Sequence, residues 1–346
     1  MMEQFLQQAH QLHRENPVVD AHLDLAGEIL LRYQKGEKQV IRNHYLDHFK
    51  AAGINVLLCA VYVETDMLPE MGLRNALDQI GALYEDLESV ADEVFLIRSK
   101  KDLTRAVAES KTGIIIYMEG LDCIGKDLRL LRVLYELGVR GASLTWSRRN
   151  EFATGCSSAG RNTQVAGGLS ELGRQAVVEL ERLGMFIDIS HLNDEGFEEL
   201  RSLTGKPFIA THSNAKTVWD NYRNLTDEQM EILAGQGGVM GLNGCSLIAG
   251  SARKGNHIEM LCRHIEYIAE HIGAEHIGFG FDLCDSYDEA KQGQLSYQEK
   301  LDCLGSHEQI PVLTAALLER GMDEKKVKKI LGSNFYEYFL KMLPEN

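Results

Sequence analysis

The feature that most constrains the fold of this chain is a regular alternation of short apolar runs with longer amphipathic ones. Eight short runs have the composition of strands: PVVDAHLDL, INVLLCAVYV, GIIIYMEG, VRGASLTW, MFIDISH, PFIATHS, GVMGLNG and HIGFGFDL. The segments between them, such as ALDQIGALYEDLESVADEV and HIEMLCRHIEYIAEHIG, carry a helical period and end near glycines that can cap a helix. Apolar strands joined by helices are typical of a parallel sheet covered by helices.

The polar residues at the ends of these runs distinguish a closed barrel from an open sheet. Strand after strand ends in such a group, as in DAHLD, YMEG, LTW, DISH, ATHS and FGFD. A barrel brings these ends together at one mouth, whereas an open sheet scatters them along a crevice. With only five prolines, the chain also lacks a Pro-rich linker. We therefore predict a (β/α)8 barrel in a single domain over 1–346, with an N-terminal helix over 1–15 and closing helices over about 308–346.

Charge and hydropathy exclude several classes of partner. The chain carries 36 basic and 51 acidic residues, a formal net charge of -15, which disfavours nucleic acid and anionic membranes. Its longest apolar runs reach about half of the ~20 residues that a membrane helix needs. The start, MMEQFLQQAHQLHRENP, lacks the pattern of a signal peptide, and the seven cysteines include no CxxC pair. We expect a cytoplasmic protein with reduced thiols.

The first candidate for metal chemistry is the pair His22 and Asp24 in the run VVDAHLDL. Residues two apart on a strand point to the same side, so both side chains can face the barrel interior. Such a pair can hold a metal ion with two ligands. A hydrogen-bonded His/Asp pair without metal is the alternative.

Three more runs end in side chains of the same kind. Glu119 closes GIIIYMEG, where a buried carboxylate is costly unless a cation or a hydrogen-bond network satisfies it. His191 and His212 end two consecutive runs, MFIDISH and FIATHS. Together with the first pair they make three imidazoles and two carboxylates, a set suited to two divalent ions that share a carboxylate. We predict two such ions, with zinc expected.

Two further residues fit the chemistry of hydrolysis. Asp282 ends the last apolar run and is placed to move a proton between the attacking water and the leaving group, although a sixth ligand or a structural cap is the alternative. Arg223, in NYRNLTDEQ, can clamp a substrate carboxylate, although an arginine on the surface or capping a helix is the alternative. Because two metals activate water and polarise a carbonyl, a serine nucleophile is not needed, and the chain has no GxSxG motif.

These motifs, in order along almost the whole chain, resemble the renal or membrane dipeptidase family, a branch of the amidohydrolase-like metal barrels. The matching segments are DAHLD, the pair Glu119–Gly120, DISH, THSN, RNLTDEQ, FDL and ILGSNFYEYF. The resemblance implies hydrolysis of dipeptides by a metallo-dipeptidase, often with tolerance for a D-residue at the C-terminal position. It implies these roles: His22 and Asp24 on one zinc, His191 and His212 on the other, Glu119 bridging, Asp282 in proton transfer, and Arg223 on the C-terminal carboxylate of the peptide.

One position departs from the family pattern. Better-known members carry a substrate-contacting histidine after the fourth strand, whereas this chain reads LTWSRRN with Trp146 there. An indole donates one hydrogen bond and takes no proton, so Trp146 either contacts the substrate differently or packs the pocket wall. This departure keeps open an amidohydrolase acting on N-acyl amino acids, cyclic amides or lactones.

The remaining alternative is a barrel that binds metal or peptide without turnover, which the intact ligand set disfavours. The polar N-terminus fits a bacterial-type member without membrane attachment. The resemblance is the sole ground for expecting a homodimer.

Overall fold

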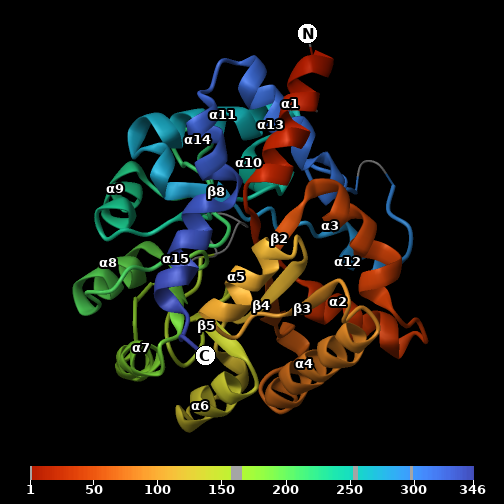
Figure 1. Ribbon diagram of the computed structural model, residues 1–346. Coiled ribbons are helices and arrows are strands. Elements are labelled where there is room, and N and C mark those ends of the chain that lie inside the picture. The colour runs from red at the N-terminus through yellow and green to blue at the C-terminus, as the bar shows by residue number, and fades with distance from the viewer. Residues whose placement is uncertain (1, 157–165, 252–255, 297–298) are drawn as a thin grey trace.

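The computed structural model describes residues 2–156, 166–251, 256–296 and 299–346 (Figure 1). All strand pairs of its one sheet are parallel. The strands are β1 (Val18–Leu23), β2 (Ile54–Tyr62), β3 (Val94–Leu96), β4 (Thr112–Glu119), β5 (Val139–Ser143), β6 (Phe186–Asp188), β7 (Met240–Leu242) and β8 (Ile277–Phe279).

The sheet closes on itself. Hydrogen-bonded neighbours follow the order β6-β5-β4-β2-β1-β8-β7. The gap between β7 and β6 is filled by residues 209 and 210, because Ile209 bridges Asp188 of β6 and Ala210 bridges Met240 of β7. Counting this segment, all eight predicted runs take part in the ring, and the predicted (β/α)8 barrel is confirmed.

The run PFIATHS forms only these two bridges because side chains occupy the next backbone donors. The Thr211 amide donates to Asp188 Oδ1 at 2.8 Å, and the His212 amide donates to Ser190 Oγ at 3.1 Å. Side-chain oxygens thus replace the carbonyls of a regular ladder. The barrel is irregular at the edge where His212 lies.

One strand was not predicted. The three residues of β3 pair with Thr112–Ile114 at the start of β4. Strand β5 pairs with the same strand from Ile116 onward. A strand this short has too few residues to show an alternating pattern in the sequence. It extends the sheet outside the eight-membered ring.

Helices surround the strands (Figure 1). Three of them, α13, α14 and α15, lie within residues 308–346, where closing helices were predicted. Helix α1 lies where the N-terminal helix was predicted and packs against α13. The helices are α1 (Met2–Glu15), α2 (Leu25–Gln34), α3 (Leu46–Ala52), α4 (Gly72–Glu88), α5 (Lys100–Ala108), α6 (Arg129–Glu136), α7 (Glu171–Leu183), α8 (Asp194–Leu203), α9 (Asp227–Gly235), α10 (Ser246–Ala249), α11 (His257–His271), α12 (Asp285–Gln292), α13 (Ile310–Glu319), α14 (Glu324–Lys328) and α15 (Asn334–Met342).

The inside of the barrel is apolar except at its mouth. Val19, Val56 and Ile115 form one buried cluster with Phe186 and with Phe339 of α15. The rings of Phe186 and Phe339 lie 5.5 Å apart, so α15 seals the amino-terminal end of the barrel. Polar ligands can therefore enter only at the carboxyl ends of the strands, where such barrels place their active sites.

Strand β1 contains an irregularity that directs the His22 side chain into the barrel mouth. Val19 and Ala21 face the interior cluster, so unbroken alternation would turn His22 toward the outer helices. The pairing of β1 with β2 shifts register between Asp20 and Leu23. This bulge reverses the alternation and brings His22 into the barrel mouth.

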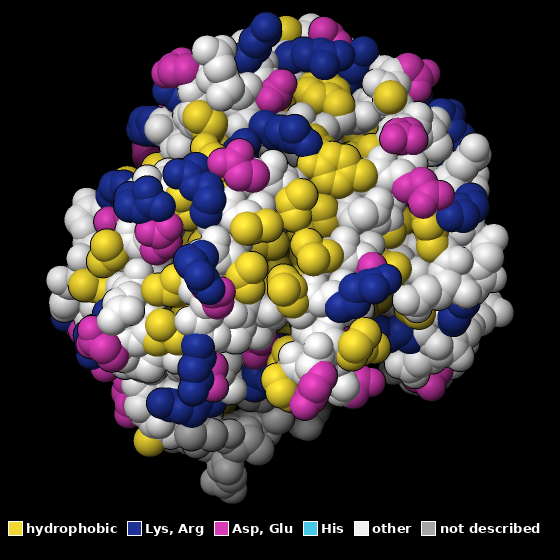
Figure 2. Space-filling model, turned by 90° about the horizontal axis from the view of Figure 1, so that it is seen from below, with side chains coloured by type: hydrophobic (Ala, Val, Ile, Leu, Met, Phe, Trp, Pro, Cys, Tyr) yellow, Lys and Arg dark blue, Asp and Glu magenta, His cyan; other side chains and the backbone are white. Residues whose placement is uncertain are grey.

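Among the described residues on the face shown in Figure 2, no large patch consists of charged side chains of one sign only. Lys, Arg, Asp and Glu side chains are interspersed there, around a group of hydrophobic side chains near the centre. The excess of acidic residues is therefore not concentrated on this face. Among the helices of the described ranges, none combines the length and the apolar character needed to cross a bilayer.

Candidate active site

The five predicted metal ligands meet at the carboxyl ends of the strands. His22 lies near the end of β1, Asp24 follows that strand, and Glu119 is the last residue of β4. His191 follows β6, and His212 follows the Ala210 bridge. Four elements distant in sequence thus deliver the five side chains to one mouth.

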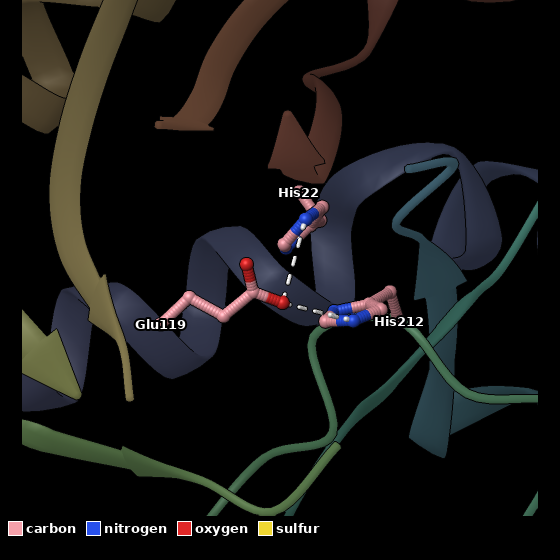
Figure 3. A group of neighbouring side chains, drawn as sticks. All are labelled: His22, Glu119 and His212. Atoms are coloured by element: carbon pink, nitrogen blue, oxygen red, sulfur yellow. Dashed lines mark ion pairs between the residues drawn. The ribbon is translucent and has the colours of Figure 1, made fainter. Parts of the chain in front are cut away.

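Glu119 lies among three imidazoles, and Figure 3 shows it with two of them, His22 and His212. Its Oε1 atom lies 2.9 Å from His191 Nε2, 3.5 Å from His212 Nε2 and 3.9 Å from His22 Nε2. All four side chains are at most 7% exposed. This placement is what a carboxylate shared by two cations requires.

A second group of ligand atoms adjoins the first. The donor atoms of His22, Asp24 and Asp282 lie within 4.8 Å of one another, as do those of His22, Glu119 and His212. His22 Nε2 is 3.3 Å from Asp282 Oδ1. His22 belongs to both groups, so the two sets of possible ligands adjoin.

The shifts in pKa show that negative charge is concentrated among the predicted ligands. Burial by itself lowers the pKa of His22, but the carboxylates of Glu119 and Asp282 outweigh burial and raise it to about 10. Burial raises the pKa of Asp24 to about 6 and that of Glu119 well above its usual range. The site therefore holds carboxylates that need more positive charge nearby than the protein's own groups provide.

The other two histidines are electrically different from His22. Burial, reinforced by repulsion from Arg223 and His22, lowers the pKa of both His191 and His212 well below the ordinary value. Both imidazoles are consequently neutral near pH 7. A neutral imidazole keeps a lone pair available for a metal ion.

The donor set fits a pair of divalent cations. Within the described ranges, Asp24 Oδ1 is buried without a hydrogen-bond partner, and His22 Nε2 faces only carboxylate oxygens, of which Asp282 Oδ1 is 3.3 Å away. Leaving such an atom unsatisfied costs about 1–3 kcal/mol, so a ligand is expected to contact it. The alternative of a hydrogen-bonded His22/Asp24 pair is not what the structure shows. Imidazole and carboxylate donors are those that zinc and similar ions accept.

Asp282 is held in a strained conformation beside these ligands. Its φ of 54° is in the left-handed region, which costs a residue other than glycine about 1 kcal/mol or more. Asn243 Nδ2 donates to Asp282 Oδ2 at 3.0 Å, which leaves Oδ1 facing His22. Burial alone would raise the pKa of Asp282, but His22, Arg223 and the Asn243 hydrogen bond outweigh burial and lower it. The carboxylate is thus kept ionised.

Arg223 lies next to the imidazoles and not on the surface. It is 3% exposed, and its Nη2 atom lies 3.1 Å from His191 Nε2 and 3.4 Å from the His212 carbonyl oxygen. Within the described ranges, its Nη1 atom is buried without a partner. A buried guanidinium with an unsatisfied donor is ready to receive an anionic group.

These groups line a cavity of about 390 Å³. The predicted residues Trp146 and Arg223 lie on its wall together with metal-ligand candidates and Asp282. Among the described residues, its lining comprises Asp24, Tyr62, Glu64, Glu119, Trp146, Ser147, His191, Arg223, Cys245, Leu247, Ile248, Asp282, Cys284, Tyr287, Asp288, Lys291 and Leu301.

Comparison with known families agrees with this arrangement. The sequence profile of the membrane dipeptidase family, peptidase family M19, matches residues 6–342. The chain belongs to this family.

Relatives of this M19 chain include dipeptidases from distant organisms. Dipeptidase 3 of Mus musculus is 30% identical over 96% of the chain, which spans 66% of the length of that relative. A solved structure described as dipeptidase AC, a metallopeptidase of family M19, is 27% identical with a TM-score of 0.82, over 96% of this chain and 99% of that one. A Rhodobacter sphaeroides metallopeptidase bound to a phosphinate mimic of the dipeptide L-Ala-D-Ala is 27% identical with a TM-score of 0.82, over 94% and 99% of the two chains.

In this M19 member, Trp146 is part of an aromatic wall beside the ligands. Its ring centroid lies 4.9 Å from that of Tyr62 and 5.9 Å from that of His191. The Arg148 guanidinium lies over both the Trp146 and the Tyr62 rings, at 5.3 and 5.6 Å, and is itself held by Asp122 at 3.0 Å. Trp146 is therefore fixed in place by its neighbours.

Sequence reasoning missed part of the cavity. Tyr62 ends β2, and Glu64 follows it, so the rule that used polar strand ends could have found both. Tyr287, Asp288 and Lys291 lie on α12, where nothing in the local sequence marks a helix at a barrel mouth. Lys291 forms an ion pair with Glu64, which links α12 to the end of β2.

Proposed function

We propose that this chain is a dinuclear metallo-dipeptidase, with zinc as the expected ion, that cleaves short peptides with a free C-terminal carboxylate. The single observation that carries the proposal is the position of Glu119 among three imidazoles, with the unsatisfied Arg223 Nη1 beside them. Membership of the M19 family and the dipeptidase names of its relatives support it.

The ligands divide between the two cation positions. His22 and Asp24 would hold one ion, His191 and His212 the other, and Glu119 would bridge them. Bound divalent cations lower the pKa of water, polarise the scissile carbonyl and stabilise the developing oxyanion. The chain contributes the geometry: four buried side chains whose donor atoms already converge, so little reorganisation accompanies binding.

Asp282 supplies the proton transfers in this proposal. Its Oδ1 atom faces the ligand cluster, while Oδ2 is engaged by Asn243. Oδ1 takes a proton from the water that attacks the peptide carbonyl and returns it to the departing amine, so that acid and amine leave with balanced charge. The lowered pKa of Asp282 keeps it ionised as a base before substrate binds.

Arg223 orients the substrate. Its free Nη1 can donate to the carboxylate at the C-terminus of a dipeptide, which places the peptide bond over the neighbouring ligands. The relative from Rhodobacter sphaeroides was solved with a mimic of L-Ala-D-Ala, which supports a dipeptide substrate and tolerance for a D-residue at the C-terminal position.

A panel of substrates with measured metal content tests the proposal. Purified protein is loaded with Zn²⁺, its metal content is determined, and amino-acid release is followed from L,L and L,D dipeptides. We expect about two ions per chain and release from dipeptides. A fully metallated protein that cleaves none of these peptides contradicts the proposal.

The aromatic wall of Trp146 and Tyr62 favours one second candidate, an amidohydrolase acting on N-acyl amino acids. Such substrates keep the carboxylate for Arg223 but carry an apolar acyl group in place of the N-terminal residue. Cyclic amides and lactones belong to the same class of alternatives. Faster cleavage of N-acyl amino acids than of dipeptides in the same panel would favour this candidate.

Replacing Arg223 by methionine is expected to lower kcat/KM for dipeptides about 10²- to 10⁴-fold, mainly through KM. The reason is that a buried charge-assisted pair with the substrate carboxylate contributes about 3–5 kcal/mol when one partner is removed. The measurement compares a dipeptide with its C-terminal amide. Wild type should discriminate strongly against the amide and Arg223→Met only weakly; equal discrimination by both proteins would remove Arg223 from carboxylate binding.

A further inference from the structure

Each imidazole of the cluster is held from its other side by a hydroxyl group. Their Nε2 atoms face Glu119, so their Nδ1 atoms point away from it. The Nδ1 partners are Tyr117 OH for His22, Ser147 Oγ for His191 at 3.0 Å and Thr211 Oγ1 for His212 at 2.7 Å. Groups that orient metal-binding histidines from the far side commonly control how well the metal is held.

Two of these hydroxyls lead to the same carboxylate. Tyr117 OH lies 3.4 Å from Thr211 Oγ1, and Thr211 Oγ1 lies 2.8 Å from Asp188 Oδ2. Tyr117 and Thr211 are fully buried, and Asp188 is 2% exposed. We call Tyr117, Thr211 and Asp188 the hydroxyl relay. It connects imidazoles assigned to different cation positions.

The hydrogen bonds at the two oxygens of Asp188 indicate which way the hydroxyl protons of the relay point. Asp188 Oδ1 accepts three hydrogen bonds, from the Ser190 amide, the Ser190 hydroxyl and the Thr211 amide. The Thr211 hydroxyl donates to the other oxygen, Oδ2, so donors face Asp188 at both of its oxygens.

The remaining protons follow from this first one. With its proton on Asp188, the Thr211 oxygen can only accept, so it receives His212 Nδ1–H and the Tyr117 hydroxyl proton. With the Tyr117 proton directed to Thr211, the Tyr117 oxygen receives His22 Nδ1–H, and both His22 and His212 then carry a proton on Nδ1.

We propose that the hydroxyl relay keeps a proton on Nδ1 of both His22 and His212, so that Nε2 is the atom each imidazole offers to a cation and one buried carboxylate prepares both cation positions. This inference rests on the metal site of the proposed function and deepens it. Tyr117, Thr211 and Asp188 act through the ligands, so they are positioning residues.

The variant Asp188→Asn tests the direction of the relay. The amide oxygen is expected to take the Oδ1 place, where three donors already converge, which leaves the amide NH₂ facing Thr211 Oγ1. Thr211 then turns its proton toward His212 Nδ1 and favours the tautomer with a proton on Nε2. We expect the affinity for one of the two zinc ions to fall about 10- to 100-fold.

The variant Tyr117→Phe tests the other branch. It keeps the ring and removes the acceptor for His22 Nδ1–H, so the affinity for the other zinc ion should fall by about 10- to 100-fold. The double variant should weaken both binding steps. The matched control is Tyr338→Phe, since Tyr338 is a buried tyrosine whose hydroxyl donates to the Pro207 carbonyl at 3.2 Å, away from the ligands.

The measurement is competition for Zn²⁺ between metal-stripped protein and a chelator of known affinity, with thermal unfolding of each apo protein as a check of folding. Wild-type dissociation constants for both ions in folded Asp188→Asn and Tyr117→Phe proteins would overturn the relay. If either variant does not fold, Thr211→Val and Thr211→Ser decide, because only serine keeps the hydroxyl and equal affinities would again overturn it. Wild-type protein that binds no zinc contradicts the proposed function instead.

Discussion

Replacing Asp282 by asparagine is expected to lower kcat about 10²- to 10⁴-fold, the range that proton transfer by a positioned side chain contributes. The amide can still accept a hydrogen bond at the place of Oδ1, but it cannot take a proton from water. Because Asp282 faces the cluster through a single oxygen at 3.3 Å from His22, the loss should appear in kcat and much less in KM.

Steady-state kinetics on a dipeptide, together with metal analysis of the same preparation, measures this effect. The matched control is Asp78→Asn, the same carboxylate-to-amide change at a 40% exposed side chain of α4 that pairs with Arg74. Its kcat should equal that of the wild type. A fully metallated Asp282→Asn protein whose kcat lies within about tenfold of the wild type would assign the proton transfer to another group.

Removal of the metal ions is expected to have the largest effect. Free water has a pKa of about 15.7, against about 7 at a catalytic zinc ion, so the apo protein should lose at least about 10³-fold in activity. It should also unfold more easily, because Glu119 and Asp24 then lie buried together near Asp282 without a compensating cation. Ligand present at 1,000 times its dissociation constant stabilises a fold by about 4 kcal/mol.

Dialysis against a chelator followed by activity and thermal-melting measurements tests this expectation. Re-addition of Zn²⁺ should restore both activity and the melting temperature, whereas Mg²⁺, which prefers all-oxygen octahedral sites, should restore neither at equal concentration. The variant Glu119→Gln provides a control for charge, because it removes the shared carboxylate and should weaken both ions. Unchanged activity after verified removal of the metals would exclude the proposed chemistry.

The barrel and its ligands could be predicted from the sequence because both depend on local patterns. Each apolar run is long enough to identify a strand, and parallel strands joined by helices leave few topologies. His22, Glu119, His191 and His212 each end such a run, and a barrel brings all carboxyl ends to one mouth. Their proximity therefore follows from topology before any distance is known.

Other parts of the site depend on contacts that no local pattern encodes. The bulge that turns His22 inward is visible only as a register shift against β2. Asp188 and Thr211 appear in the sequence as ordinary polar residues of DIS and ATH, and their role as a relay requires β6 and the segment at residue 211 to be adjacent. The sequence is equally consistent with a surface position for Arg223. The structure places its Nη2 atom 3.1 Å from His191 Nε2.

By itself, then, the sequence of this chain determined the eight runs of the ring, the closed barrel and the types of the ligand residues at its mouth, because hydrophobic periodicity and strand ends are local properties. The tertiary structure alone decided which atom faces which: Glu119 lies among the imidazoles, Asp282 Oδ1 faces His22, and Tyr117, Thr211 and Asp188 form a connected chain behind the ligands. Hydrogen bonding and metal binding both depend on distances of about 3 Å. Side chains more than 20 residues apart come that close only when packing places their strands side by side.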